Sequence, residues 1–106
     1  MFKMIDEPQF ETEAKGTEPG GEAFSFKARF KALSESVQQL FDLSTAAGTV
    51  DFLRTTFVDL SDVLDANDQP VQFTTEVRDW LIDRPHARAA LVKAYFASVY
   101  GEQLGN

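Results

Sequence analysis

The sequence predicts an α+β protein in which an N-terminal β-hairpin or small antiparallel sheet packs on a bundle of about four α-helices. Residues 24–30 alternate apolar and polar side chains, which is typical of a strand with one buried face. Residues 74–100 carry apolar side chains at helical spacing, and Pro85 divides this stretch into two helices. A chain of 106 residues that is 43% hydrophobic fits one small domain.

The domain organisation is an acidic arm followed by a single α+β domain. The arm, residues 1–22, holds six acidic and two basic side chains, and residues 23–106 form the domain. Within the arm, residues 9–15 alternate weakly and are the natural hairpin partner of the strand at 23–32, across the polar turn 16–22. The arm therefore either supplies the first strand of a hairpin or stays apart from the domain.

The strand at 23–32 is expected to turn one face to the core. Its inward residues are Phe24, Phe26, Ala28 and Phe30, and polar side chains lie between them. If residues 9–15 do not hold their place beside it, residues 24–30 form an exposed edge. An unpaired edge is itself a docking site.

Two shorter helices are expected in the middle of the chain. Ser34 is predicted to cap a helix over 35–46 that Ala46-Ala47-Gly48 ends, and Thr49 is predicted to cap a second helix running to about Val58. Residues 60–64 fit either a helical turn or a short strand. Residues 65–70 form a polar turn.

The two closing helices carry the clearest signals in the chain. Thr74 or Thr75 can accept the free N–H groups of a first turn, and this helix contains the only tryptophan, Trp80. Pro85 suits the first turn of the next helix, which is expected to reach about Tyr100. Gly101 is then free to take the left-handed conformation that closes a helix.

The last helix shows two apolar faces. Such a helix is either central in its own domain or presents its second face to another chain, and the sequence leaves both open. The candidate partner-binding residues are large apolar side chains of this helix and of the strand. They are Phe24, Phe26, Phe30, Val92, Phe96, Val99 and Tyr100.

Charge and composition exclude several classes of partner. The net charge of −7 makes nucleic acid an unexpected partner, because phosphate contacts need clustered Lys and Arg. No apolar run is long enough for a transmembrane helix, and residues 1–6 lack the apolar segment of a signal peptide. The absence of cysteine fits a reducing compartment, so a cytoplasmic protein without a membrane partner is expected.

No arrangement of residues points to catalysis, a cofactor or a metal. His86 is the only histidine, so no nucleophile–base pair or Cys/His metal site can be assembled around it. Asp65, Asn67 and Gln69 match the first positions of an EF-hand loop, but Pro70 stands where that loop needs glycine. The sequence therefore predicts a non-enzymatic binding or assembly module.

The chain from residue 57 onward carries a series of spaced apolar and turn residues. They are Val58, Leu60, Val63, Asp65, Pro70, Val71, Phe73, Leu81, Asp83, Pro85, Ala90, Leu91, Ala94 and Tyr95, and the strand FKARFK followed by Leu33-Ser34 precedes them. With these residues, the segment 23–101 resembles the tail assembly chaperones of long-tailed phages and prophages. The pattern in that family is a strand leading to a first helix, then V-x-x-L-x-x-V-x-D-x-x-G-x-P-V-x-F, a helix ending in Leu-Leu-Asp, a proline, and a helix of type A-L-x-x-A-Y. The chain departs from the pattern at two points, since Leu60 follows Val58 by two residues instead of three, and Asp68 stands at the position of the turn glycine.

The resemblance implies a function without catalysis. Such chaperones bind the long helical tape-measure protein, help recruit tail-tube subunits, act in the cytoplasm of the bacterial host and are absent from the mature virion. A homo-oligomer is compatible with this role. The alternatives from other classes are a structural head–tail connector or tail completion protein, and a small regulatory protein-binding module.

Overall fold

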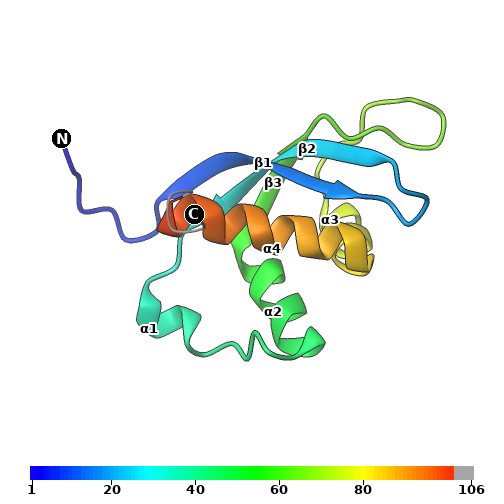
Figure 1. The fold of residues 1–106 in the computed structure, drawn as a ribbon. Helices are drawn as coiled ribbons and strands as arrows, with labels where there is room; N and C mark the ends of the chain where they lie inside the picture. Colours follow the sequence, from blue (N-terminus) through cyan, green and yellow to red (C-terminus); the bar gives the residue numbers. More distant parts are fainter. Residues whose placement is uncertain (102–106) are drawn as a thin grey trace.

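The computed structural model describes residues 1–101, and over these residues the chain forms a three-stranded antiparallel sheet and four helices (Figure 1). The α+β class and the hairpin packed on helices are thus confirmed. The elements in chain order are β1 (Gln9–Thr17), β2 (Ala23–Lys31), α1 (Glu35–Gln38), α2 (Ala46–Thr56), β3 (Phe57–Ser61), α3 (Thr75–Ile82) and α4 (Pro85–Tyr100).

The sheet has the order β1-β2-β3, with β2 in the middle. The hairpin pairs Phe10 with Phe30 and Gly16 with Phe24, so the arm does supply the first strand. Phe26, Ala28 and Phe30 are buried on the helix side, as the alternation predicts. Because β1 pairs along the whole of β2, and β3 pairs with residues 27–30 on its other side, the edge expected if residues 9–15 left their place does not form.

The third strand differs from the prediction of a helix running to Val58. The chain leaves α2 directly into β3, which pairs Lys27 with Ser61 and Arg29 with Asp59. The register shifts at the next step, where Phe30 lies opposite Phe57. This bulge gives β3 one extra residue and turns the Phe57 ring into the core, where it is 5.8 Å from the Phe30 ring.

The middle of the chain also differs from prediction. Ser34 caps α1 as expected, accepting a hydrogen bond from the Val37 N–H at 3.4 Å, but α1 ends at Gln38 instead of residue 46. The chain turns there so that Phe41 can reach Phe52, whose ring centroid lies 5.8 Å away. The next cap is Thr45, which accepts from the Gly48 N–H at 3.0 Å.

The segment Ala46-Ala47-Gly48 therefore begins a helix where the sequence predicted an end. Gly48 is required for close approach: a Cβ atom at this position would lie 1.9 Å from the carbonyl oxygen of Asp42. The glycine that resembles a helix terminator allows the preceding loop to pack against the first turn of α2.

The two closing helices follow the prediction. Thr74 caps α3 by accepting from the Val77 N–H at 3.1 Å, and α3 ends at Ile82 with Asp83 as its C-cap. Pro85 is the first residue of α4, and Gly101 closes that helix with a φ of 84°. Its ψ of 145° lies outside the left-handed helical region that was expected.

The core lies where α4 crosses under the sheet (Figure 1). One side of α4, including Ala90, Leu91, Ala94 and Tyr95, is buried, and the helix packs mainly on β1. The other side meets α2, where the Phe96 ring stacks on the Phe52 ring at 5.6 Å. The second apolar face of α4 is therefore partly covered by its own domain.

Candidate functional site

The structure distributes the predicted partner-binding residues between core and surface. Phe26 and Phe30 are buried and offer no surface to a partner. Phe24, Val92 and Phe96 are half-buried and pack against the core. Phe26 and Phe30 therefore cannot form a binding surface in this fold, because helices cover their face of β2.

Only Val99 and Tyr100 remain exposed among the predicted residues. They lie at the end of α4 beside α1, where the Gln38 amide donates a hydrogen bond to the Tyr100 hydroxyl at 3.4 Å. Val37 and Leu40 of the neighbouring turn are also exposed, and Leu40 is 81% accessible.

A groove that the sequence did not predict lies between α3 and the loop that joins it to β3. Its exposed side chains are Leu64, 57% accessible, and Trp80, 56% accessible. The hollow between the loop and α3 has a volume of about 410 Å³. We call it the Trp80 groove and define it by its apolar lining: Val63, Leu64, Val71, Val77, Trp80 and Leu81.

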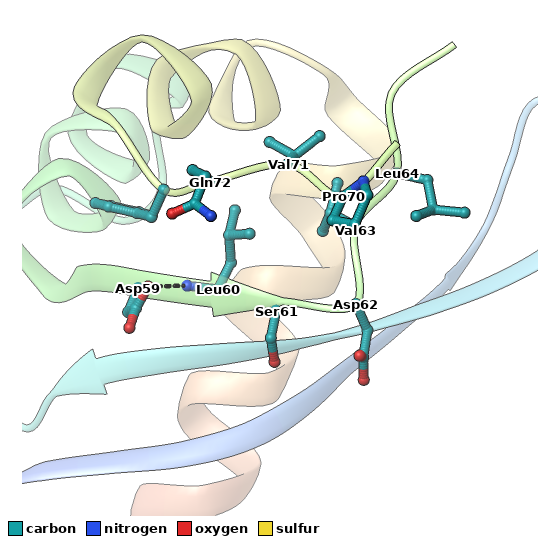
Figure 2. Close-up of a pocket in the computed structure, with 10 residues that line it drawn as sticks. Asp59, Leu60, Ser61, Asp62, Val63, Leu64, Pro70, Val71 and Gln72 are labelled. Atoms are coloured by element: carbon teal, nitrogen blue, oxygen red, sulfur yellow. Dashed lines mark hydrogen bonds between the residues drawn. The ribbon is translucent and has the colours of Figure 1, made fainter. Parts of the chain in front are cut away.

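Two further hollows adjoin the Trp80 groove. One of about 260 Å³ runs toward the start of β2 and α4, is lined by Phe24 and His86, and shares Leu64 and Trp80 with the groove. The other, of about 340 Å³, lies on the β3 side of the loop (Figure 2). Figure 2 shows Leu60 pointing from β3 toward the returning segment 71–73, whereas Asp59 and Asp62 point away from it. All three hollows have Val63 and Leu64 in their lining.

The local sequence builds this loop as a closed turn. The Val71 N–H donates to the Val63 carbonyl at 2.9 Å, and Leu64 forms an isolated bridge with Pro70. At the tip, one oxygen of Asp65 accepts from the backbone N–H groups of Asn67 at 2.8 Å and Gln69 at 3.0 Å. Asp62 and Asp68 both adopt positive φ, at 64° and 60°, which Asp tolerates better than most residues. These contacts fix the position of Leu64 in the absence of any partner.

The same contacts explain the partial EF-hand pattern. The Asp65 carboxylate is occupied by backbone N–H groups of its own turn. Over residues 1–101 no group of three or more His, Asp or Glu side chains is placed to hold a metal ion. The residues that match the EF-hand pattern, Asp65, Asn67 and Gln69, form a hydrogen-bonded turn.

Trp80 is held at the rim of the groove by a cation. The guanidinium carbon of Arg84 lies 4.1 Å from the centre of the Trp80 ring, and Arg84 also pairs with Asp83 at 3.3 Å. Stacking covers one face of the indole and leaves about half of the side chain in water. On the loop side of the groove Asp65 belongs to the lining, and Asp62 and Asp68 are exposed elsewhere on the same loop, so this rim is acidic.

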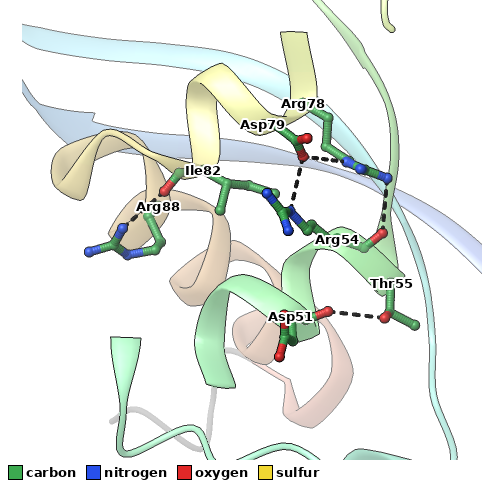
Figure 3. A network of polar contacts seen from close by, with 7 residues as sticks. All are labelled: Asp51, Arg54, Thr55, Arg78, Asp79, Ile82 and Arg88. Atoms are coloured by element: carbon green, nitrogen blue, oxygen red, sulfur yellow. Dashed lines mark hydrogen bonds and ion pairs between the residues drawn. The ribbon is translucent and has the colours of Figure 1, made fainter. Parts of the chain in front are cut away.

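A polar network supports α3 from behind (Figure 3). The Asp79 carboxylate accepts from Arg78 at 3.0 Å and from Arg54 of α2 at 3.2 Å, and Arg78 donates to the Arg54 carbonyl at 3.3 Å. The hydrogen bond from Arg78 is the main reason that the pKa of Asp79 is lowered. The network ties α2 to α3 and so fixes the helix that carries Trp80.

The described titratable groups form no reactive set. His86 meets the Phe24 ring edge-on, with 5.8 Å between the ring centres, and each ion pair of the described chain joins side chains that are at least partly exposed.

Among the described residues, no helix is both long and apolar enough to cross a membrane. Exposed apolar surface in a preformed groove supports binding of another polypeptide.

Comparison of the chain with protein-family models, curated proteins and solved structures gave no match.

Proposed function

We propose that this chain is a non-enzymatic module that binds an apolar segment of another polypeptide in the Trp80 groove. The observation that carries the proposal is the pair of half-exposed side chains, Trp80 and Leu64, in a groove that the fold holds open. A large aromatic ring in a rigid setting contributes much binding energy at a small cost in side-chain entropy.

The particular function that fits best is that of a phage tail assembly chaperone. The groove lies within residues 57–101, the part of the chain that carries most of the resemblance to that family. A tape-measure protein is a long amphipathic helix, and an apolar groove can cover its apolar stripe. The acidic rim favours segments in which Lys or Arg flanks that stripe.

On this proposal the chain acts in the cytoplasm of the bacterial host and leaves before the virion is complete. Binding of a tail-tube subunit would require a second surface, for which the exposed side chains at Val37, Leu40 and Tyr100 are candidates. Recovery of the chain from purified mature particles would contradict the chaperone role and favour a structural connector.

The groove can be tested by co-expression with a tape-measure protein from the same gene cluster. The double substitution Leu64→Asp with Trp80→Asp is expected to remove most of the gain in soluble tape-measure protein, because charged side chains cannot cover its apolar stripe. The measurement is soluble yield after centrifugation, with circular dichroism of the purified variant to show that the domain is folded.

Leu40→Asp is the matched control, since it places the same charge on an exposed leucine far from the groove. It should retain the full gain in soluble yield. If the groove variant is folded and still protects the tape-measure protein, the Trp80 groove is not the binding site.

A further inference from the structure

The chain carries a second unpartnered apolar element, the leading segment Met1–Ile5. Phe2 is 90% and Met4 is 95% accessible, and Met1 and Ile5 are exposed as well. Figure 1 shows this segment running away from the body of the molecule. Lys3 carries the only charged side chain before Asp6. The segment is thus a short extended apolar chain with one basic group.

Phe2 and Met4 cannot together occupy the hollows of their own molecule. Residues 7 and 8 are anchored at the end of β2: the Ala32 N–H donates to the Pro8 carbonyl at 2.8 Å, and Glu7 pairs with Lys31 at 3.7 Å. The hollows lie at the opposite end of β2, beside Phe24 and Phe26.

This limit follows from the length of the leading segment compared with the length of β2. The five strand residues from Lys31 back to Phe26 span about 17 Å. Met4 lies three residues before Glu7 and can be at most about 11 Å from it. Phe2 can extend about 17 Å from Glu7, but Met4 stays short of the hollows, so both side chains can be accommodated only in the hollows of another molecule.

The segment and the groove are complementary in shape and charge. In an extended chain Phe2 and Met4 project to the same side, about 7 Å apart. Two apolar hollows of about 260 Å³ and 410 Å³ meet at the shared Leu64 and Trp80 side chains. Lys3 projects to the opposite side, away from the hollows, and the acidic loop that contributes Asp65 to the groove favours a segment with this positive charge.

We propose that this chain self-associates by segment exchange, with Phe2 and Met4 of one copy in the two hollows that meet at Leu64 and Trp80 of a second copy. The proposal does not rest on the chaperone function, because the occupant is the chain itself. Five residues form a small interface, so the association is weak, with a dissociation constant of about 10–500 µM.

The experiment is sedimentation velocity on the purified full chain between about 1 µM and 1 mM, a range chosen to bracket that constant. The average mass of the unsubstituted chain should rise with concentration. It should stay at the monomer value for Phe2→Asp with Met4→Asp, and equally for Leu64→Asp with Trp80→Asp. Leu40→Asp, which alters neither surface, should associate like the unsubstituted chain.

Mixing the two monomeric variants gives the sharpest readout. The first has an intact groove and the second an intact leading segment, so an equimolar mixture should form heterodimers with a single exchanged segment. Phe2 and Met4 are exposed, so their substitution cannot unfold the domain.

Three results would overturn segment exchange: a monomer at every concentration, association that survives Phe2→Asp with Met4→Asp, or a mixture that stays monomeric. None of them involves the tape-measure protein, so the chaperone proposal would stand or fall separately.

Discussion

Tyr95 is the residue on which the core converges. It is fully buried, and its ring lies 4.9 Å from Phe52, 5.5 Å from Phe30 and 5.1 Å from Phe96. Its hydroxyl accepts a hydrogen bond from the Leu33 N–H at 3.0 Å, across 62 residues of chain. One side chain therefore joins α4, α2, the sheet and the segment that leaves β2.

Tyr95→Phe is expected to lower the free energy of unfolding by about 1–2 kcal/mol, because the Leu33 N–H loses its acceptor while the ring contacts remain. Urea unfolding at neutral pH measures the difference. Tyr100→Phe is the control, since that hydroxyl is exposed, and it should change stability by less than about 0.5 kcal/mol. Equal stability of Tyr95→Phe and the unsubstituted chain would show that the hydrogen bond contributes nothing.

Trp80 illustrates why the groove was missed from the sequence. Val77, Trp80 and Leu81 recur at helical spacing, a pattern that does not distinguish a buried side chain from an exposed one. In the structure Leu81 and Ile82 are buried and Trp80 is left outside. A helix of eight residues with four large apolar side chains has more apolar surface than one core contact can cover, and that excess was the available signal.

At the scale of the elements, the first turn of α2 depends on a glycine. Gly48→Ala is expected to cost about 1–3 kcal/mol through overpacking against the Asp42 carbonyl, although alanine is the better helix former. Urea unfolding checks this value. Gly20→Ala is the matched control, because a Cβ atom there meets nothing within 4 Å. A stabilised Gly48→Ala protein would show that the loop before α2 moves freely.

The contact between α2 and α3 makes stability depend on pH. The pKa of Asp79 is lowered, so its ionised form favours the folded state above the ordinary carboxyl pKa of about 3.9. That contribution is lost as the pH falls below 3.9 through the lower pKa of the folded state. Asp79→Asn should therefore melt at a lower temperature than the unsubstituted chain at pH 7.

The difference in melting temperature should shrink between pH 4 and pH 2, as the unsubstituted protein takes up the proton. Thermal unfolding followed by circular dichroism at several pH values measures it. Asp51→Asn provides a comparison, because Asp51 is exposed and only its backbone carbonyl is used, by Thr55. A difference that is constant over this pH range would mean that Asp79 acts through shape and not through its charge.

At the scale of the whole molecule, short-range sequence patterns predicted the hairpin and the two closing helices. The hairpin follows from alternation over residues 24–30, and the α3–α4 pair from Thr74 and Pro85. The third strand could not be found in this way, because residues 57–61 follow α2 without a turn and are defined by pairing with β2, some thirty residues earlier. The groove depends on the conformation of a loop with two Asp residues at positive φ, which sequence periodicity does not report.

The central place of α4 has a consequence for how the protein is made on the ribosome. The apolar face of β2 is complete at Lys31, yet the helix that covers it begins at Pro85, more than fifty residues later. At 5–20 residues per second, synthesis reaches the start of α4 about 3–11 s after it completes the β1–β2 hairpin. During that interval the phenylalanines of β2 are exposed to the other polypeptides of the cell.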